Sequence, residues 1–98
     1  MGTYQIRETD TDQKWFESLR DLNARFRIAA RIRRVSLGHL GDVKPVGEGV
    51  HELRITYGPG YRVYFIQHGD TVIVLLAGGD KSTQKRDIER AKELARGL

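Results

Sequence analysis

Residues 50–77 read VHELRITYGPGYRVYFIQHGDTVIVLLA, and this stretch decides the fold. Its three runs rich in β-branched and aromatic residues, at 50–57, 61–68 and 71–77, are typical of strands. Gly58-Pro59-Gly60 and Gly69-Asp70 separate the runs and favour tight turns. We therefore predict a three-stranded antiparallel meander. The unbroken apolar run at 72–76 predicts that the last strand is the middle of the sheet, covered on both faces.

Helical patterns lie on both sides of the meander. A first helix is expected to start near Thr11, where four N-cap candidates at 9–12 precede apolar residues at helical spacing. Asp21 can cap a second helix, whose apolar stripe should pack on the sheet: Leu22, Phe26, Ala29, Ile32 and Val35. A last helix over about 82–96 is expected to be capped by Ser82 and Thr83.

The remaining segments complete a small α+β domain. Residues 3–7 alternate as a strand with one buried face does, and the glycine-rich segment 38–49 predicts a loop. The expected order is β-α-α-β-β-β-α, with a mainly antiparallel four-stranded sheet packed by helices. At 98 residues the chain has room for one core, so we expect a single domain over 1–98.

Composition restricts the partners and the location. The 17 Lys and Arg residues against 13 Asp and Glu give a net charge of +4, which favours a polyanionic partner such as nucleic acid. The chain has no cysteine, which excludes disulfides and thiolate zinc sites. No apolar run approaches the roughly 20 residues that span a bilayer, and the polar start has no signal core. We therefore expect a cytoplasmic protein without a membrane partner.

Three cations are expected to converge at one end of the meander. Strand alternation displays Arg54 opposite the face of Leu53, and Arg62 could approach it across the turn, although the sequence does not fix the register. Lys81 follows the last strand directly. Such a patch could hold a phosphodiester for attack by a 2′-hydroxyl without a metal, with Lys81, His51 or His68 as the base. An ordinary charged sheet surface is the alternative.

The second helix carries a dense group of arginines with one acid, Asp21, among them. The group consists of Arg20, Arg25, Arg27, Arg31, Arg33 and Arg34. They flank the apolar stripe, so they form either a solvated face or a surface for phosphates or an acidic partner. The three histidines show no metal-ligand spacing, and residues 78–83 lack the Walker spacing, so we predict no metal and no cofactor.

Four motifs together resemble the addiction-module killer proteins. They are residues 41–47 (GDVKPVG), 52–54 (ELR), 58–64 (GPGYRVY) and 76–84 (LAGGDKSTQ). The chain resembles the RelE/ParE toxin superfamily, near its HigB-like members, from Trp15 to the last helix. This resemblance implies a RelE-like fold and the toxin of a prokaryotic type II toxin–antitoxin pair. Such a toxin cleaves messenger RNA on the ribosome and is silenced by an antitoxin, typically a helix-turn-helix protein.

The resemblance also implies site residues. In RelE-like toxins basic residues on the meander and at the end of the last strand surround the scissile phosphate, and Arg54, Arg62 and Lys81 match those places. RelE also uses a tyrosine in its C-terminal helix, whereas residues 84–87 read QKRD without an aromatic. Contacts to RNA are expected from six further residues: Arg25, Arg27, Arg31, Arg34, Tyr64 and Gln84.

Two alternatives share the fold. ParE-like members inhibit DNA gyrase by binding and do not cleave RNA. A non-catalytic relative would bind only its antitoxin, in which case the arginines would serve an acidic protein segment.

Overall fold

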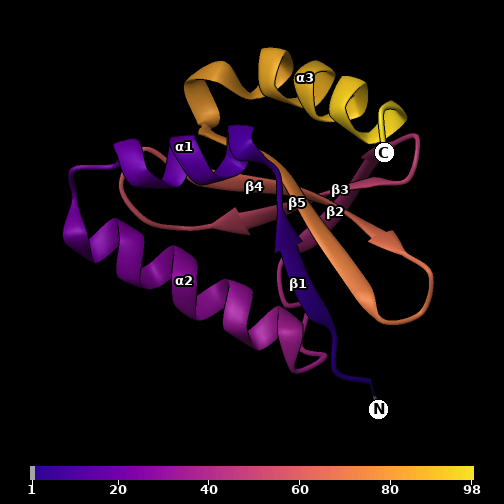
Figure 1. Ribbon diagram of the computed structural model, residues 1–98. Helices are drawn as coiled ribbons and strands as arrows, with labels where there is room; N and C mark the ends of the chain where they lie inside the picture. The colour runs from indigo at the N-terminus through magenta and orange to yellow at the C-terminus, as the bar shows by residue number, and fades with distance from the viewer. Residues whose placement is uncertain (1) are drawn as a thin grey trace.

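A computed structural model describes residues 2–98 and shows a five-stranded sheet between two helical layers (Figure 1). Helices α1 and α2 cover one face of the sheet, and α3 covers the other. The elements in chain order are β1 (Gln5–Glu8), α1 (Asp10–Ser18), α2 (Leu22–Ser36), β2 (Val43–Gly47), β3 (Val50–Ile55), β4 (Tyr61–His68), β5 (Val72–Asp80), a 3₁₀ turn η1 (Lys81–Thr83) and α3 (Gln84–Arg96). No helix in this part of the chain is both long and apolar enough to cross a bilayer.

The sheet is mixed, with the strand order β1-β5-β4-β3-β2. The meander β3-β4-β5 is antiparallel as expected, while β1 pairs with β5 in parallel. The prediction of four strands was wrong, because β2 lies in the segment expected to be a loop and pairs with β3. Pro45 and the bulge before Gly47 are tolerated there because β2 is an edge strand. The middle strand is therefore β4 and not β5.

Thr9 fixes the start of α1, which begins at Asp10, one residue before the expected position. Its hydroxyl accepts a hydrogen bond from the Asp12 amide at 3.0 Å and donates one to the Leu76 carbonyl at 2.6 Å. This N-cap therefore ties the helix to β5, because a single side chain satisfies both elements.

Helix α2 is capped by Asp21 as predicted, but it turns a different face to the sheet. The side chain of Asp21 accepts hydrogen bonds from the amides of the first turn. Ala24, Ile28 and Val35 are the buried residues, whereas Leu22 and Phe26 are 73% and 74% exposed. The predicted stripe was thus wrong in its N-terminal half, and a row of apolar side chains on α2 faces outward.

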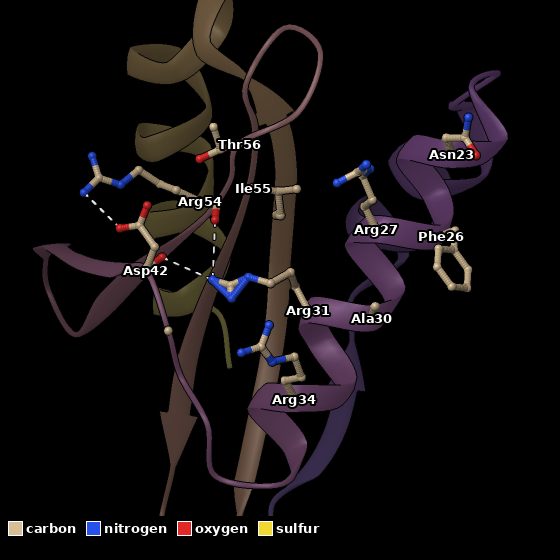
Figure 2. A pocket seen from close by; sticks show the side chains of 11 residues that line it. Asn23, Phe26, Arg27, Ala30, Arg31, Arg34, Asp42, Arg54, Ile55 and Thr56 are labelled. Atoms are coloured by element: carbon tan, nitrogen blue, oxygen red, sulfur yellow. Dashed lines mark hydrogen bonds and ion pairs between the residues drawn. The ribbon is translucent and has the colours of Figure 1, made fainter.

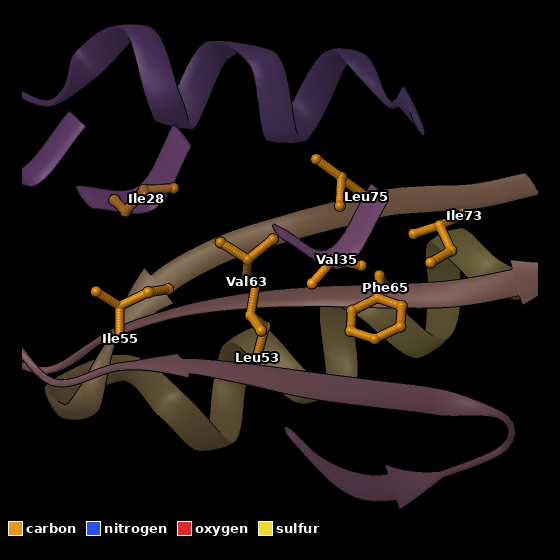
Figure 3. Close-up of a cluster of buried hydrophobic side chains, with 8 residues drawn as sticks. All are labelled: Ile28, Val35, Leu53, Ile55, Val63, Phe65, Ile73 and Leu75. Atoms are coloured by element: carbon orange, nitrogen blue, oxygen red, sulfur yellow. The ribbon is translucent and has the colours of Figure 1, made fainter. Parts of the chain in front are cut away.

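Two hydrophobic clusters lie on the two faces of the sheet. Figure 3 shows the cluster toward α1 and α2, which comprises Ile28, Val35, Leu53, Ile55, Val63, Phe65, Ile73 and Leu75. The cluster toward α3 comprises Val50, Tyr64, Val74, Leu76, Ala77 and Ala91. Both clusters take alternate residues of the same strands, so β5 is covered on both faces, as its apolar run predicts.

The glycine pair at the end of β5 allows two close approaches. A Cβ on Gly78 would lie 2.2 Å from the ring of Trp15, and a Cβ on Gly79 would collide with the Asp87 carboxylate. The turn after this strand differs from the prediction, because Asp80 accepts the Ser82 amide at 2.8 Å. Thr83 makes no capping bond and its hydroxyl donates to Asp87 instead. Small residues here let α1 and α3 pack directly on the strand.

Candidate active site

Arg54 and Arg62 occupy directly opposite positions on β3 and β4. Their side chains lie on the sheet face that α3 partly covers, and they are 37% and 12% exposed. Both line a hollow of about 250 Å³ beside the turn at 58–60, together with Asp42, Ile55, Thr56 and Tyr57. The structure thus brings together the first two predicted cations in a register that the sequence left open.

Other groups hold the outer ends of the two arginines. Arg54 Nη2 lies 3.2 Å from Asp42 Oδ1 in the loop before β2. Arg62 Nη1 donates to the Gly60 carbonyl at 3.2 Å. Gly60 has a φ of +80°, a conformation that strongly favours glycine, so the turn composition allows this carbonyl to face the guanidinium.

Glu52 lies under both arginines and is fully buried. Its Oε1 is 4.0 Å from Arg54 Nε, and its Oε2 is 3.7 Å from Arg62 Nε. Sequence reasoning placed Glu52 on the same strand face as Arg54 but gave it no role. The signal was an acid alternating with an arginine, directly across from Tyr64 on the next strand.

Tyr64, which is buried, and Gln84, which is partly exposed, both contact Glu52. The Tyr64 hydroxyl donates to Glu52 Oε2 at 3.1 Å, and Gln84 Nε2 donates to the same oxygen at 2.7 Å. Burial, followed by the charge of Glu52, raises the pKa of Tyr64 above its ordinary value. Tyr64 has no exposed surface, so its prediction as an RNA-contacting residue was wrong.

Lys81 is the exposed residue that follows β5. A side chain at position 60 would begin 3.5 Å from Lys81 Cβ and 3.6 Å from Arg62 Nη1. Lys81 therefore begins beside the same turn residue as Arg62, near enough for its flexible side chain to reach the hollow. The third predicted cation lies at the margin of the pair.

Neither histidine candidate for the base lies at the pair. His51 stacks on Phe65 with ring centroids 5.5 Å apart, on the sheet face toward α2. His68 ends β4, six residues beyond Arg62, which is roughly 20 Å along an extended strand. Within residues 2–98 no group of three or more His, Cys, Asp and Glu side chains is arranged to hold a metal ion.

The predicted arginines of α2 have separate surroundings. Arg25 lies over the ring of Phe16, and Arg27 lies 4.6 Å from the ring centroid of Tyr57. The guanidinium of Arg31 donates to the carbonyls of residues 40, 42 and 54, and its burial lowers its pKa. Arg31 therefore braces the loop before β2 against β3.

A groove of about 750 Å³ runs between α2 and β3 (Figure 2). Arg27, Arg31 and Arg34 line it from the helix, and Arg54 lines it from the strand. Asp42, Arg54, Ile55 and Thr56 line both the groove and the smaller hollow, so the two lie next to each other. The groove thus places three of the predicted α2 arginines on the α2 side of the strand that carries Arg54.

Known proteins resemble the chain in sequence and in structure. The profile of the family described as phage derived protein Gp49-like (DUF891) matches residues 14–96. A protein of Haemophilus influenzae is 48% identical over 96 residues, which cover 98% of this chain and 97% of that protein.

Two solved structures share the fold. The Escherichia coli toxin RelE, as a double mutant in the free state, superposes with a TM-score of 0.69 at 14% identity, covering 92% of this chain and 98% of that one. A RelBE toxin–antitoxin complex of Mycobacterium tuberculosis gives 0.54 at 23% identity, covering 81% and 99%. The architecture of β1 to α3 is therefore RelE-like.

Proposed function

Because this chain belongs to the Gp49-like family of phage-derived proteins and has a RelE-like fold, we propose that it is a toxin of a type II toxin–antitoxin pair. We assign it to the HigB-like branch, with cleavage of ribosome-bound messenger RNA as its activity. The second solved relative is a toxin bound to its antitoxin, which supports an antitoxin partner for this chain, here a helix-turn-helix protein. Its place of action is the prokaryotic cytoplasm.

The observation that carries the proposal is the Arg54–Arg62 pair. Two guanidiniums at opposite positions on neighbouring strands border a hollow beside a glycine turn. Planar guanidiniums bind phosphate oxygens through paired N–H groups. Like charges directly opposite each other in a sheet are destabilising, so an anionic ligand between them would relieve a cost of the fold. A phosphodiester is the ligand that this arrangement fits.

The reaction we assign is an internal transesterification. The 2′-oxygen of the nucleotide forms a bond to phosphorus while the bond from phosphorus to the 5′-oxygen breaks. A base takes the 2′-hydroxyl proton, the leaving 5′-oxygen gains a proton, and the products are a 2′,3′-cyclic phosphate and a 5′-hydroxyl. Arg54 and Arg62 would stabilise the charge that develops on the phosphoryl oxygens, so the step needs neither metal nor cofactor.

Lys81 is the base candidate that the geometry favours. Its Cβ lies beside the turn that also holds Arg62, whereas His51 lies on the opposite sheet face and His68 lies at the far end of β4. The groove along α2 lies next to the hollow and would hold the RNA on one side of the scissile phosphate. Gln84 is then assigned to the support of the site through Glu52.

The test is translation in a cell-free bacterial system with and without the protein, with message ends mapped by primer extension. We expect new message ends that require ribosomes and disappear with Arg62→Ala. Arg7→Ala is the matched control, because it removes an exposed arginine from β1 at the other side of the sheet and should leave cleavage intact. Intact message together with inhibited DNA supercoiling would instead identify a gyrase inhibitor. Intact message and supercoiling with retained antitoxin binding would identify a non-catalytic relative.

A further inference from the structure

Glu52 is a fully buried carboxylate with four polar neighbours. Its Oε2 accepts hydrogen bonds from Tyr64 and Gln84, and it lies 3.7 Å from Arg62 Nε. Its Oε1 lies 4.0 Å from Arg54 Nε. Burying a carboxylate is costly unless other groups compensate its charge, so this arrangement needs the two arginines above it.

The position of Glu52 determines which atoms of the two guanidiniums face the hollow. The atom of each guanidinium closest to Glu52 is Nε, the one nearest the stem of the side chain. The outer nitrogens therefore extend beyond Glu52 toward the hollow that Arg54 and Arg62 line. One carboxylate oxygen faces each arginine at ion-pair distance, so Glu52 contributes to the placement of both guanidiniums, whose outer ends contact Asp42 and the Gly60 carbonyl.

Two further residues fix Glu52 itself. Tyr64 approaches from the directly paired position on β4, and Gln84 approaches from the first turn of α3. Both donate to the same oxygen, which restrains rotation of the carboxylate about its last bond. Hydrogen bonds from β4 and α3 thus hold the carboxylate independently of the two arginines.

We propose that Glu52 is a positioning residue that orients Arg54 and Arg62 to receive a phosphate group. This role rests on the proposed function, and Glu52 acts through the arginines without touching the RNA. Its charge also cancels part of the repulsion between the two cations, so they can stand side by side before a ligand arrives. Preorganised donors cost no rearrangement when charge develops in the reaction.

The experiment compares Glu52→Gln and Glu52→Asp with the natural protein. Glutamine keeps the size and removes the charge, whereas aspartate keeps the charge and withdraws it by one methylene group. Tyr64→Phe keeps both and removes one hydrogen bond to the carboxylate, so it serves if the Glu52 variants do not fold. Glu93→Gln is the control, since it removes the same charge from an exposed position on α3.

The first readout is message cleavage on the ribosome. We expect kcat to fall by about 10- to 100-fold in both Glu52 variants with KM changed less than about twofold, because small misplacements of reacting groups cost rates of this order. Tyr64→Phe should lose less, and Glu93→Gln should match the natural protein. Full activity in a folded Glu52→Asp variant would overturn the positioning role of Glu52 and show that only its charge matters. Full activity in folded Glu52→Gln would remove both roles.

The second readout does not depend on cleavage. The Nε–H signals of Arg54 and Arg62 can be followed by NMR in ¹⁵N-labelled protein while inorganic phosphate is added. We expect weaker phosphate binding in Glu52→Gln than in the natural protein, although the variant carries one more net positive charge. Stronger phosphate binding in Glu52→Gln than in the natural protein would refute the positioning role. Nε–H signals that are the same in Glu52→Gln and the natural protein would refute it as well. If the natural protein does not cleave RNA, the proposed function fails while this readout still decides the role of Glu52.

Discussion

Asp12 predicts a pH-dependent stability whose size follows from its burial. The side chain is 2% exposed, and this burial, together with the charge and hydrogen bonding of Glu8, raises its pKa from 3.8 to about 7. Between about pH 4 and pH 7 the folded protein therefore holds a proton that the unfolded chain has released. The free energy of unfolding must fall as the pH rises through this window. Three pH units at about 1.4 kcal/mol each correspond to a loss of roughly 4 kcal/mol.

Substitution of Asp12 by asparagine isolates this contribution. Asparagine does not titrate, so the part of the pH dependence that Asp12 causes should disappear. Glu8 and Arg33 line the same hollow and are unchanged in the variant. Urea unfolding at pH 5 and pH 8 covers about two pH units of the window between pH 4 and pH 7. We expect the difference in free energy of unfolding between these pH values to be about 3 kcal/mol smaller in Asp12→Asn than in the natural protein.

Asp10→Asn provides the control for this measurement. Asp10 is exposed in the first turn of the same helix, so its removal should lower stability equally at both pH values. All groups other than the substituted one are common to the three proteins, so their contributions cancel in the comparison. An equal pH dependence in Asp12→Asn and the natural protein would refute the assignment of a raised pKa to Asp12.

Two further substitutions test the packing of α1 on β5. Gly78→Val should lower the free energy of unfolding by at least about 1–3 kcal/mol, because the ring of Trp15 occupies the space of a Cβ; an unchanged urea midpoint would contradict this packing. Thr9→Val should cost about 1–2 kcal/mol in urea unfolding with an unchanged m-value, because it deletes the bonds to Asp12 and Leu76. A loss below about 0.3 kcal/mol would show that the cap contributes little.

The meander could be predicted from sequence because its signals are local. Strand alternation and the two glycine turns determine β3, β4 and β5 without knowledge of distant contacts. The strand β2 could not be recognised in the same way, since Pro45 and its neighbouring glycines are typical of loops. An edge strand tolerates them because it needs hydrogen bonds on one side only.

The prediction of which face of α2 is buried was wrong because it followed a series of three-residue steps. Each step of three residues turns a helix by about 300°, so a series of such steps drifts around the axis. Leu22 and Val35 therefore lie roughly 140° apart and cannot share a face. The core instead follows Ala24, Ile28 and Val35. Leu22 and Phe26, which the sequence predicted to be buried, are exposed to solvent.

The two arginines of the candidate site could be predicted from the sequence, but the buried residues that contact them could not. Alternation put Arg54 and Arg62 on one face, and the register then made them direct partners. The burial of Glu52 depends on the packing of α3 against the sheet, which no local pattern reveals. Tyr64 was misassigned for the same reason, since its burial also depends on the packing of α3 on that face.

The parallel pairing of β1 with β5 has a consequence for the order of folding during synthesis. The partner of β1 begins 64 positions further along the chain, at Val72 after Glu8. At about 5 to 20 residues per second, the ribosome needs roughly 3 to 13 s to produce that partner. During this time the N-terminal strand has no hydrogen-bonding partner in its own sheet. We therefore expect the sheet to stay incomplete until the residues of β5 have been made.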